Sequence, residues 1–257
     1  MDLIVNGKKL SIKHYLNLNL KPSNVEGVDL YPLYSQVIYE SNSTKFKAFH
    51  FIEFTGSTIF CSKDEEPRIL DESFLKDEKE LRKTDEKILK IVEYEILKYK
   101  NEFSLKGLGK RIPIYGSSVL DIVTDSLGFS MLKFLGSKFT HNEYLDIFGE
   151  NEPFVDKVAK AIALKPDLLN SMPRHLQYYS IVSILTKVFN DSTRESITGY
   201  DLLLGSKRKD AFYNNIRQIF PSLNSKDSSI QISNPSLDEL FAVIPTLIDE
   251  KIKAMMN

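Results

Sequence analysis

Residues 3–20 alternate apolar and polar side chains, and the alternation is interrupted by Asn6-Gly7. This dipeptide favours a tight turn because both residues tolerate positive φ, so the pattern predicts a β-hairpin. A helix that begins at Ser11 is the alternative, since serine is a good N-cap. The predicted apolar face consists of Leu3, Val5, Leu10, Ile12, His14, Leu16, Leu18 and Leu20, and the opposite face carries Lys13, Tyr15, Asn17 and Asn19.

Residues 46–61 predict a second hairpin. Their centre, residues 55–58, has the sequence Thr-Gly-Ser-Thr, which suits a type II′ turn with Gly56 first. Residues 21–29 are rich in turn-forming residues and predict a loop, whereas the aromatic-rich residues 31–40 fit either strand or helix. Residues 62–70 predict a charged linker.

Residues 71–103 contain neither glycine nor proline and predict a long helix. Their apolar side chains, at positions 74, 81, 88, 92, 96, 99 and 103, form one helical stripe. This helix is either an arm that docks on a partner or a helix packed on the protein's own core. Its second half is dense in apolar residues, which favours packing on the core. A second helix that begins at Thr84 is an alternative.

The remainder of the chain predicts a helical bundle separated by glycine, proline and serine signals. Residues 107–116 predict a loop, after which Ser117 or Ser118 caps an apolar helix to about Leu135. Further helices are predicted at about 140–148, 153–164, 172–190, 198–204, 207–219 and 236–256, the last with a kink or break at Pro245. Residues 222–235 predict a loop with a short strand at 230–232.

The predicted fold class is therefore α+β, with a small antiparallel β-hairpin sheet followed by a predominantly α-helical bundle. The predicted domains are a β-rich module at 1–67 and a helical domain at 71–257, which form either two units or one.

Composition excludes several classes of protein. The chain has 257 residues, 42% of them hydrophobic, and a net charge of -1, so it is neither disordered nor strongly basic. Cys61 is the single cysteine, which rules out an internal disulfide and fits a reducing compartment. No apolar run is long enough for a membrane span, and the N-terminus lacks the pattern of a signal peptide. We expect a cytoplasmic protein, or one within a particle assembled in the cytoplasm, encoded by an AT-rich genome such as that of a phage or plasmid.

No catalytic, cofactor or metal site is predicted. Cys61 and His50 would be diagonal neighbours in the favoured hairpin register, too far apart for a nucleophile and its base. The four histidines lack metal-ligand spacing. Asp121 and Asp125 lie four residues apart on one predicted helix, where a capping role for Asp121 is simpler than a cation site. The Gly-rich residues 107–111 lack the spacing of a phosphate loop.

The most basic local segment is 198–219, which outlines a helix-turn-helix around Gly205-Ser206. Its side chains suit phosphate and base contacts, while the alternative is a surface helix with a core stripe of Phe212, Ile216, Ile219 and Phe220. The candidate nucleic-acid-binding residues are Lys207, Arg208, Lys209, Tyr213, Asn214 and Arg217.

The absence of a persuasive catalytic motif favours a non-catalytic protein–protein interaction or assembly subunit, with a protein partner or a second copy of the chain. The alternatives are a nucleic-acid-binding protein and an enzyme whose site is assembled from distant loops. The candidate protein-interface residues are Phe74, Leu81, Leu240, Phe241, Ile244 and Leu247.

Overall fold

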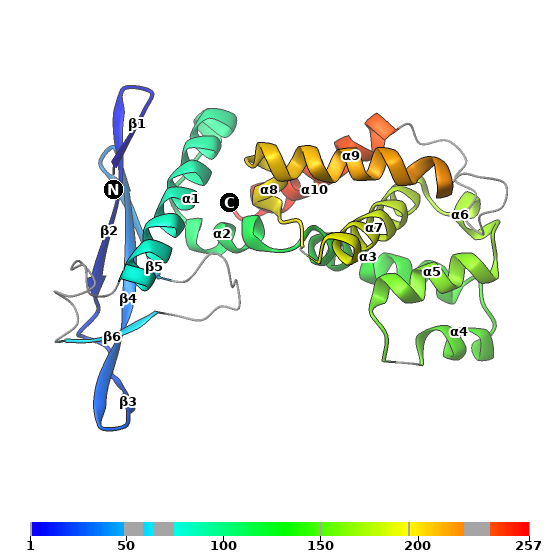
Figure 1. Cartoon of the computed structure of the whole chain (residues 1–257), viewed down its shortest axis with the longest axis horizontal. Helices are drawn as coiled ribbons and strands as arrows, with labels where there is room; N and C mark the ends of the chain where they lie inside the picture. The colour runs from blue at the N-terminus through cyan, green and yellow to red at the C-terminus, as the bar shows by residue number, and fades with distance from the viewer. Residues whose placement is uncertain are drawn as a thin grey trace. The chain divides into compact units, whose positions relative to one another are not determined.

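The computed structural model describes residues 2–48, 59–63, 75–149, 151–194, 196–223 and 237–256. Within these residues an antiparallel sheet is followed by a succession of helices, which confirms the predicted α+β class (Figure 1). No helix in the described part of the chain is long and apolar enough to cross a membrane.

The chain divides into two compact units. The first comprises Met1–Gly116 together with Ile252–Asn257, and the second comprises Ser117–Lys251. The division lies about fifty residues after the predicted boundary near 67–71, because the first two α-helices contact the sheet and belong to its unit.

The sheet of the first unit is organised around one long strand, β4. Its bounds and those of its neighbours are β1 (Asp2–Val5), β2 (Lys8–Leu16), β3 (Ser23–Val25), β4 (Val28–Tyr39), β5 (Asn42–Lys47) and β6 (Phe60–Ser62). Strands β1 and β2 form the predicted hairpin, with φ of 52° at Asn6 and 75° at Gly7. The hairpin prediction is confirmed, and the alternative of a helix that begins at Ser11 is wrong.

One loop prediction is wrong, and one hairpin prediction did not include the pairing of its ends with β4. The predicted loop at 21–29 contains β3, which pairs with the start of β4 through a tight turn at Glu26-Gly27. The described ends of the predicted 46–61 hairpin pair with β4, and they also meet each other where the Ile59 N–H donates to the Ala48 carbonyl oxygen at 3.0 Å. Leu33 donates its N–H to Ile59 and accepts from the N–H of Ala48, so β5 and β6 follow one another along the same edge of β4.

One face of this sheet is buried under helices. Strand alternation places Ile12, Leu16, Leu33 and Val37 on this inner face, and all four are buried. The alternation ends at Leu16, because the predicted face residues Leu18 and Leu20 are exposed in the turn that follows. We call the opposite side of the sheet the outer face.

Helix α1 (Leu75–Tyr99) packs on the inner face and is followed by the short η2 (Lys100–Glu102). The long helix is confirmed for these residues, and it is not split at Thr84, which is buried within it. Helix α2 (Leu108–Gly116) occupies the predicted loop. Gly109 lies against the side chain of Phe46, where a Cβ atom would approach to 2.8 Å, so the close packing of α2 on β5 requires glycine at this position.

The second unit is a helical bundle in which α3 and α7 pack together. Ser118 caps α3 as predicted, and Phe189 and Phe212 meet edge to face at 5.1 Å. Helix α10 continues through Pro245 without a break. The helix bounds are α3 (Val119–Gly136), α4 (His141–Phe148), α5 (Phe154–Leu164), α6 (Leu168–Ser171), α7 (Arg174–Thr193), α8 (Gly199–Leu203), α9 (Ser206–Leu223) and α10 (Leu237–Ala254).

Candidate functional site

The outer face of the sheet carries two adjacent rows of side chains that cross three strands. Register places Gln36 of β4 between Lys13 of β2 and Lys45 of β5. The next row places Tyr34 between Tyr15 and Lys47. Side chains directly opposite in an antiparallel pair lie on the same face, so these six residues form one continuous surface. We call it the Lys-Tyr face.

The two tyrosines form the centre of the Lys-Tyr face. The rings of Tyr15 and Tyr34 stack with centroids 5.8 Å apart and planes 30° apart. The ammonium of Lys45 lies 5.1 Å from the centre of the Tyr15 ring, within cation–π range. Both rings are partly exposed, so they offer flat aromatic surface beside positive charge.

The charge of the Lys-Tyr face is positive although the whole chain is nearly neutral. Lys13, Lys45 and Lys47 are exposed, and none of them forms a salt bridge within the described residues. Nearby Lys9 is paired with Asp2 at 2.7 Å, and its hydrogen bond lowers the pKa of the Asp2 carboxyl. Three ammonium groups on one sheet surface form a local site for anions.

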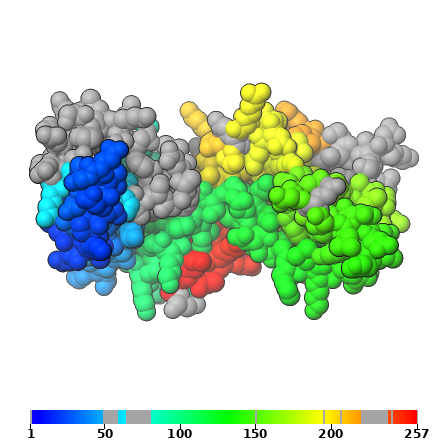
Figure 2. Space-filling model, turned by 90° about the horizontal axis from the view of Figure 1, so that it is seen from below, coloured from blue at the N-terminus to red at the C-terminus, as the bar shows by residue number. Residues whose placement is uncertain are grey.

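Lysine ammonium groups bind phosphates, and tyrosine rings stack on nucleobases. The helices of this unit lie on the other side of the sheet, so they do not cover these side chains (Figure 1). Figure 2 shows strands β1 to β5 in space-filling form as the blue surface of this unit. The arrangement is therefore chemically suited to an extended chain of aromatic bases and phosphates.

The inner face holds a Ser-His-Asp arrangement that sequence reasoning did not detect. His14 Nε2 lies 2.9 Å from a carboxylate oxygen of Asp85 on α1, and its Nδ1 lies 3.2 Å from the Ser35 hydroxyl. Ser35 is only 1% exposed beneath the helix, so no substrate reaches its hydroxyl. The three residues therefore join α1 to the sheet and do not form a nucleophilic site.

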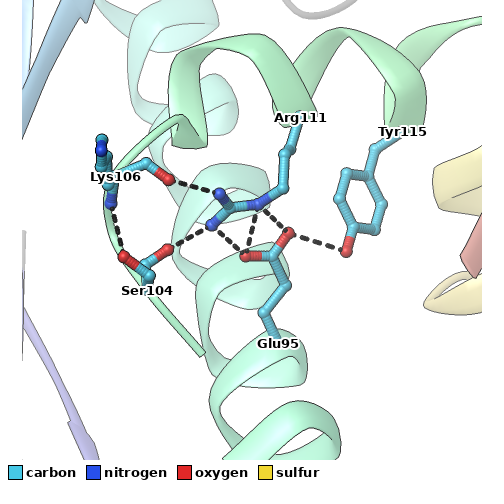
Figure 3. Close-up of polar contacts among 5 residues, drawn as sticks. All are labelled: Glu95, Ser104, Lys106, Arg111 and Tyr115. Atoms are coloured by element: carbon cyan, nitrogen blue, oxygen red, sulfur yellow. Dashed lines mark hydrogen bonds and ion pairs between the residues drawn. The ribbon is translucent and has the colours of Figure 1, made fainter. Parts of the chain in front are cut away.

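A buried ion pair joins α1 to α2 (Figure 3). Arg111 donates to both carboxylate oxygens of Glu95, and Nη2 lies 2.8 Å from Oε2. The same guanidinium donates to the carbonyl oxygens of Ser104 and Lys106, each at 2.6 Å. Tyr115 donates its hydroxyl to Glu95 at 3.1 Å. Arg111 thus fixes the backbone of residues 104–106, which corrects the sequence interpretation of 107–111 as a surface loop.

Burial dominates the electrostatics of this cluster. Glu95 and Arg111 are both 0% exposed. Burial raises the pKa of the Glu95 carboxyl, while the bonds from Arg111 and Tyr115 oppose that rise. Burial and the nearby carboxylate also raise the pKa of the Tyr115 hydroxyl far above its usual range. The phenol therefore remains a hydrogen-bond donor at any physiological pH.

The structure places the residues of the predicted helix-turn-helix on α8 and α9, where several make internal contacts. Arg208 donates to the Ser196 carbonyl oxygen at 2.9 Å and lies 3.4 Å from Asp201. Tyr213 packs on Phe241 with ring centroids 4.2 Å apart.

The other predicted residues of this segment lie along α9. The Arg217 guanidinium lies over the Phe241 ring at 5.3 Å and donates to Asn214. Lys209 lies 5.9 Å from the Tyr213 ring, and Lys207 is exposed. Phe212 and Ile216 are buried, as the surface-helix alternative predicted. No observation tests nucleic-acid binding by these residues, and it stays a prediction.

The carboxylate, thiol and histidine candidates are not brought together. Asp121 accepts a hydrogen bond from the Ser118 hydroxyl at 2.6 Å, whereas exposed Asp125 lies 3.6 Å from Lys251, so the capping interpretation is confirmed. Cys61 is buried on the inner face opposite Tyr31, and His50 lies outside the described residues. Within the described chain no three metal-ligating side chains form a group.

Three of the six predicted protein-interface residues are buried in the described structure. Leu81, Ile244 and Leu247 are buried, and partly exposed Phe241 packs against Tyr213. The position of Phe74 and the side chain of Leu240 lie outside the described part of the structure. The expectation of a protein-interaction or assembly subunit remains a prediction.

The sequence contained only part of the signal for the Lys-Tyr face. The alternation placed Lys13 and Tyr15 on the polar side of a strand, whereas the link to Tyr34, Lys45 and Lys47 depends on the register around β4. Comparison of the chain with protein-family models, with curated proteins and with solved structures found no match. The functional argument therefore rests on the site itself.

Proposed function

We propose that this chain is a non-catalytic protein that binds single-stranded nucleic acid on the Lys-Tyr face. The observation that carries the proposal is the register that places stacked Tyr15 and Tyr34 beside the exposed ammonium groups of Lys13, Lys45 and Lys47. Sheets that bind single strands combine exposed aromatic rings with a positive surface that follows the backbone.

A single strand fits this face better than a duplex. The faces of paired bases are occupied by stacking within a duplex, and only an unstacked base can lie on a tyrosine ring. Among the described residues, no helix protrudes from this face to enter a major groove. Gln36, between two lysines, is able to donate to and accept from a base edge.

The test is the binding of a fluorescein-labelled oligothymidylate of about 20 nucleotides, measured by fluorescence anisotropy at about 50 and about 200 mM salt. We expect affinity to fall with salt. Replacing Lys13, Lys45 and Lys47 with glutamine is expected to weaken binding about tenfold or more and to reduce the salt slope by about two.

Replacement of Lys207, Arg208 and Lys209 with glutamine is the matched control, because it removes three charges from another part of the chain. This control is expected to retain wild-type affinity. Loss of binding in the control with full binding in the sheet variant would move the site to α9. No salt-dependent binding by the wild type would refute the proposal.

A further inference from the structure

The first unit contains a pocket of about 690 Å³ between the turns of the sheet and the end of α1. One side is formed by Asn6 in the β1–β2 turn and by the β4–β5 turn that begins at Glu40. The other side is formed by residues 100–107, which connect α1 to α2. Lys13, Lys45 and Lys47 are not among the residues that line this pocket.

The wall formed by residues 100–107 is held in place before any ligand arrives. Arg111 binds the carbonyl oxygens of Ser104 and Lys106 from behind, and Arg111 is itself fixed by buried Glu95 (Figure 3). Phe103 adds an edge-to-face contact with the Tyr39 ring at 6.2 Å. A wall fixed by buried bonds does not lose conformational entropy on binding, which favours affinity.

The lining of the pocket is polar and carries positive charge. Lys100 and Lys106 are exposed on its wall. The carboxylate in the lining, Glu40, is already paired with Lys8, whose pKa it raises. The amides of Asn6, Asn42 and Asn101, which also line the pocket, supply both donors and acceptors.

Lys100 also has a backbone conformation that a lysine rarely adopts. Its φ is 46°, at the end of α1, where glycine is the common residue. Asn6 and Glu40 have φ of 52° and 55°, but hairpin turns require such values. Arg194 has the same left-handed conformation at the end of α7, with φ of 57°, so what distinguishes Lys100 is its position in the pocket lining.

We propose that this pocket binds a small phosphorylated sugar, with the phosphate at Lys100 and Lys106 and the hydroxyl groups at the asparagine amides. Ammonium groups suit the phosphate, and amides satisfy both the donors and the acceptors of a sugar. The inference is independent of nucleic-acid binding, because it uses a different set of residues.

The experiment titrates the full chain with ribose 5-phosphate, ribose and inorganic phosphate by isothermal calorimetry. We expect ribose 5-phosphate to bind, phosphate to bind more weakly and ribose not to bind measurably. The double variant Lys100→Gln/Lys106→Gln is expected to lose at least about tenfold in affinity. The control variant Lys45→Gln/Lys47→Gln should bind ribose 5-phosphate like the wild type.

A second variant separates ligand binding from stability. Lys100→Gly should raise the melting temperature, because it removes the left-handed lysine, and should weaken ribose 5-phosphate binding. A concentration of about 10 mM detects even a ligand of millimolar affinity. If ribose 5-phosphate does not bind at this concentration, the inference is overturned. Equal binding by Lys100→Gln/Lys106→Gln and the wild type would overturn it too, and equal affinity for phosphate and ribose 5-phosphate would refute the sugar contacts.

Discussion

Replacing Arg111 with methionine is expected to lower the free energy of unfolding of the first unit by about 3–5 kcal/mol. The variant leaves the Glu95 carboxylate buried without its cation and removes the donors to the Ser104 and Lys106 carbonyl oxygens. A buried acceptor without a donor costs the desolvation of that group. Urea unfolding followed by far-UV circular dichroism measures the change.

Lys110→Met is the control for this variant, because Lys110 is exposed on the same helix, and we expect it to change stability by less than about 0.5 kcal/mol. The double variant Glu95→Leu/Arg111→Met removes both charges and should be more stable than Arg111→Met alone. A stability of Arg111→Met within about 1 kcal/mol of the wild type would show that the ion pair does not hold α1 and α2 together.

Replacing Tyr15 and Tyr34 with alanine is expected to weaken oligothymidylate binding by about 1–3 kcal/mol for each base that stacks on a ring, or roughly 5- to 150-fold per base. The anisotropy titration described for the lysine variant measures this effect. Because both rings also stabilise the sheet by stacking on each other, the melting temperature of each variant must be recorded beside its affinity.

The corresponding phenylalanine variants separate stacking from hydrogen bonding. Phenylalanine keeps the aromatic surface and lacks the hydroxyl, so Tyr15→Phe/Tyr34→Phe should retain most of the affinity. Alanine variants that melt at a lower temperature but bind as tightly as the wild type would assign the two rings to sheet stability alone.

The sequence predicted correctly those helices and strands whose ends are determined by a turn dipeptide, a capping residue or a proline. The turn at Asn6-Gly7, the serine cap of α3 and the prolines before α5 and α7 all mark real boundaries. Each depends on φ preferences or on a cap within a few residues.

The incorrect and the incomplete strand predictions depend on contacts between residues distant in sequence. Strand β3 has no buried residue to reveal it and is held by its pairing with β4. The predicted 46–61 hairpin is joined at its described ends by the bond from Ile59 to Ala48, but the sequence did not show that β5 pairs with β4 through the turn after Tyr39.

The helix α2 was missed for a related reason. Residues 107–116 contain glycine and proline, and the sequence did not show that Arg111 lies against Glu95, sixteen positions away. A basic residue is usually exposed, so its complete burial was not predictable from the residue type.

The same limit applied to the candidate site. The polar side of β2 was identified correctly, including Lys13 and Tyr15, but a binding surface appeared only when β4 and β5 supplied the neighbouring rows. The basic segment at 207–217 was more prominent in the sequence because its charges are consecutive. The charged residues of a sheet surface lie far apart in the sequence, and they become neighbours only through the pairing register of the strands.

The most direct test of the Lys-Tyr face is an amide chemical-shift titration of the ¹⁵N-labelled chain with unlabelled oligothymidylate. The account predicts that the largest shift changes lie on β2, β4 and β5, at Lys13, Tyr15, Tyr34, Gln36, Lys45 and Lys47. Changes confined to α8 and α9, or none at saturating oligonucleotide, would contradict it.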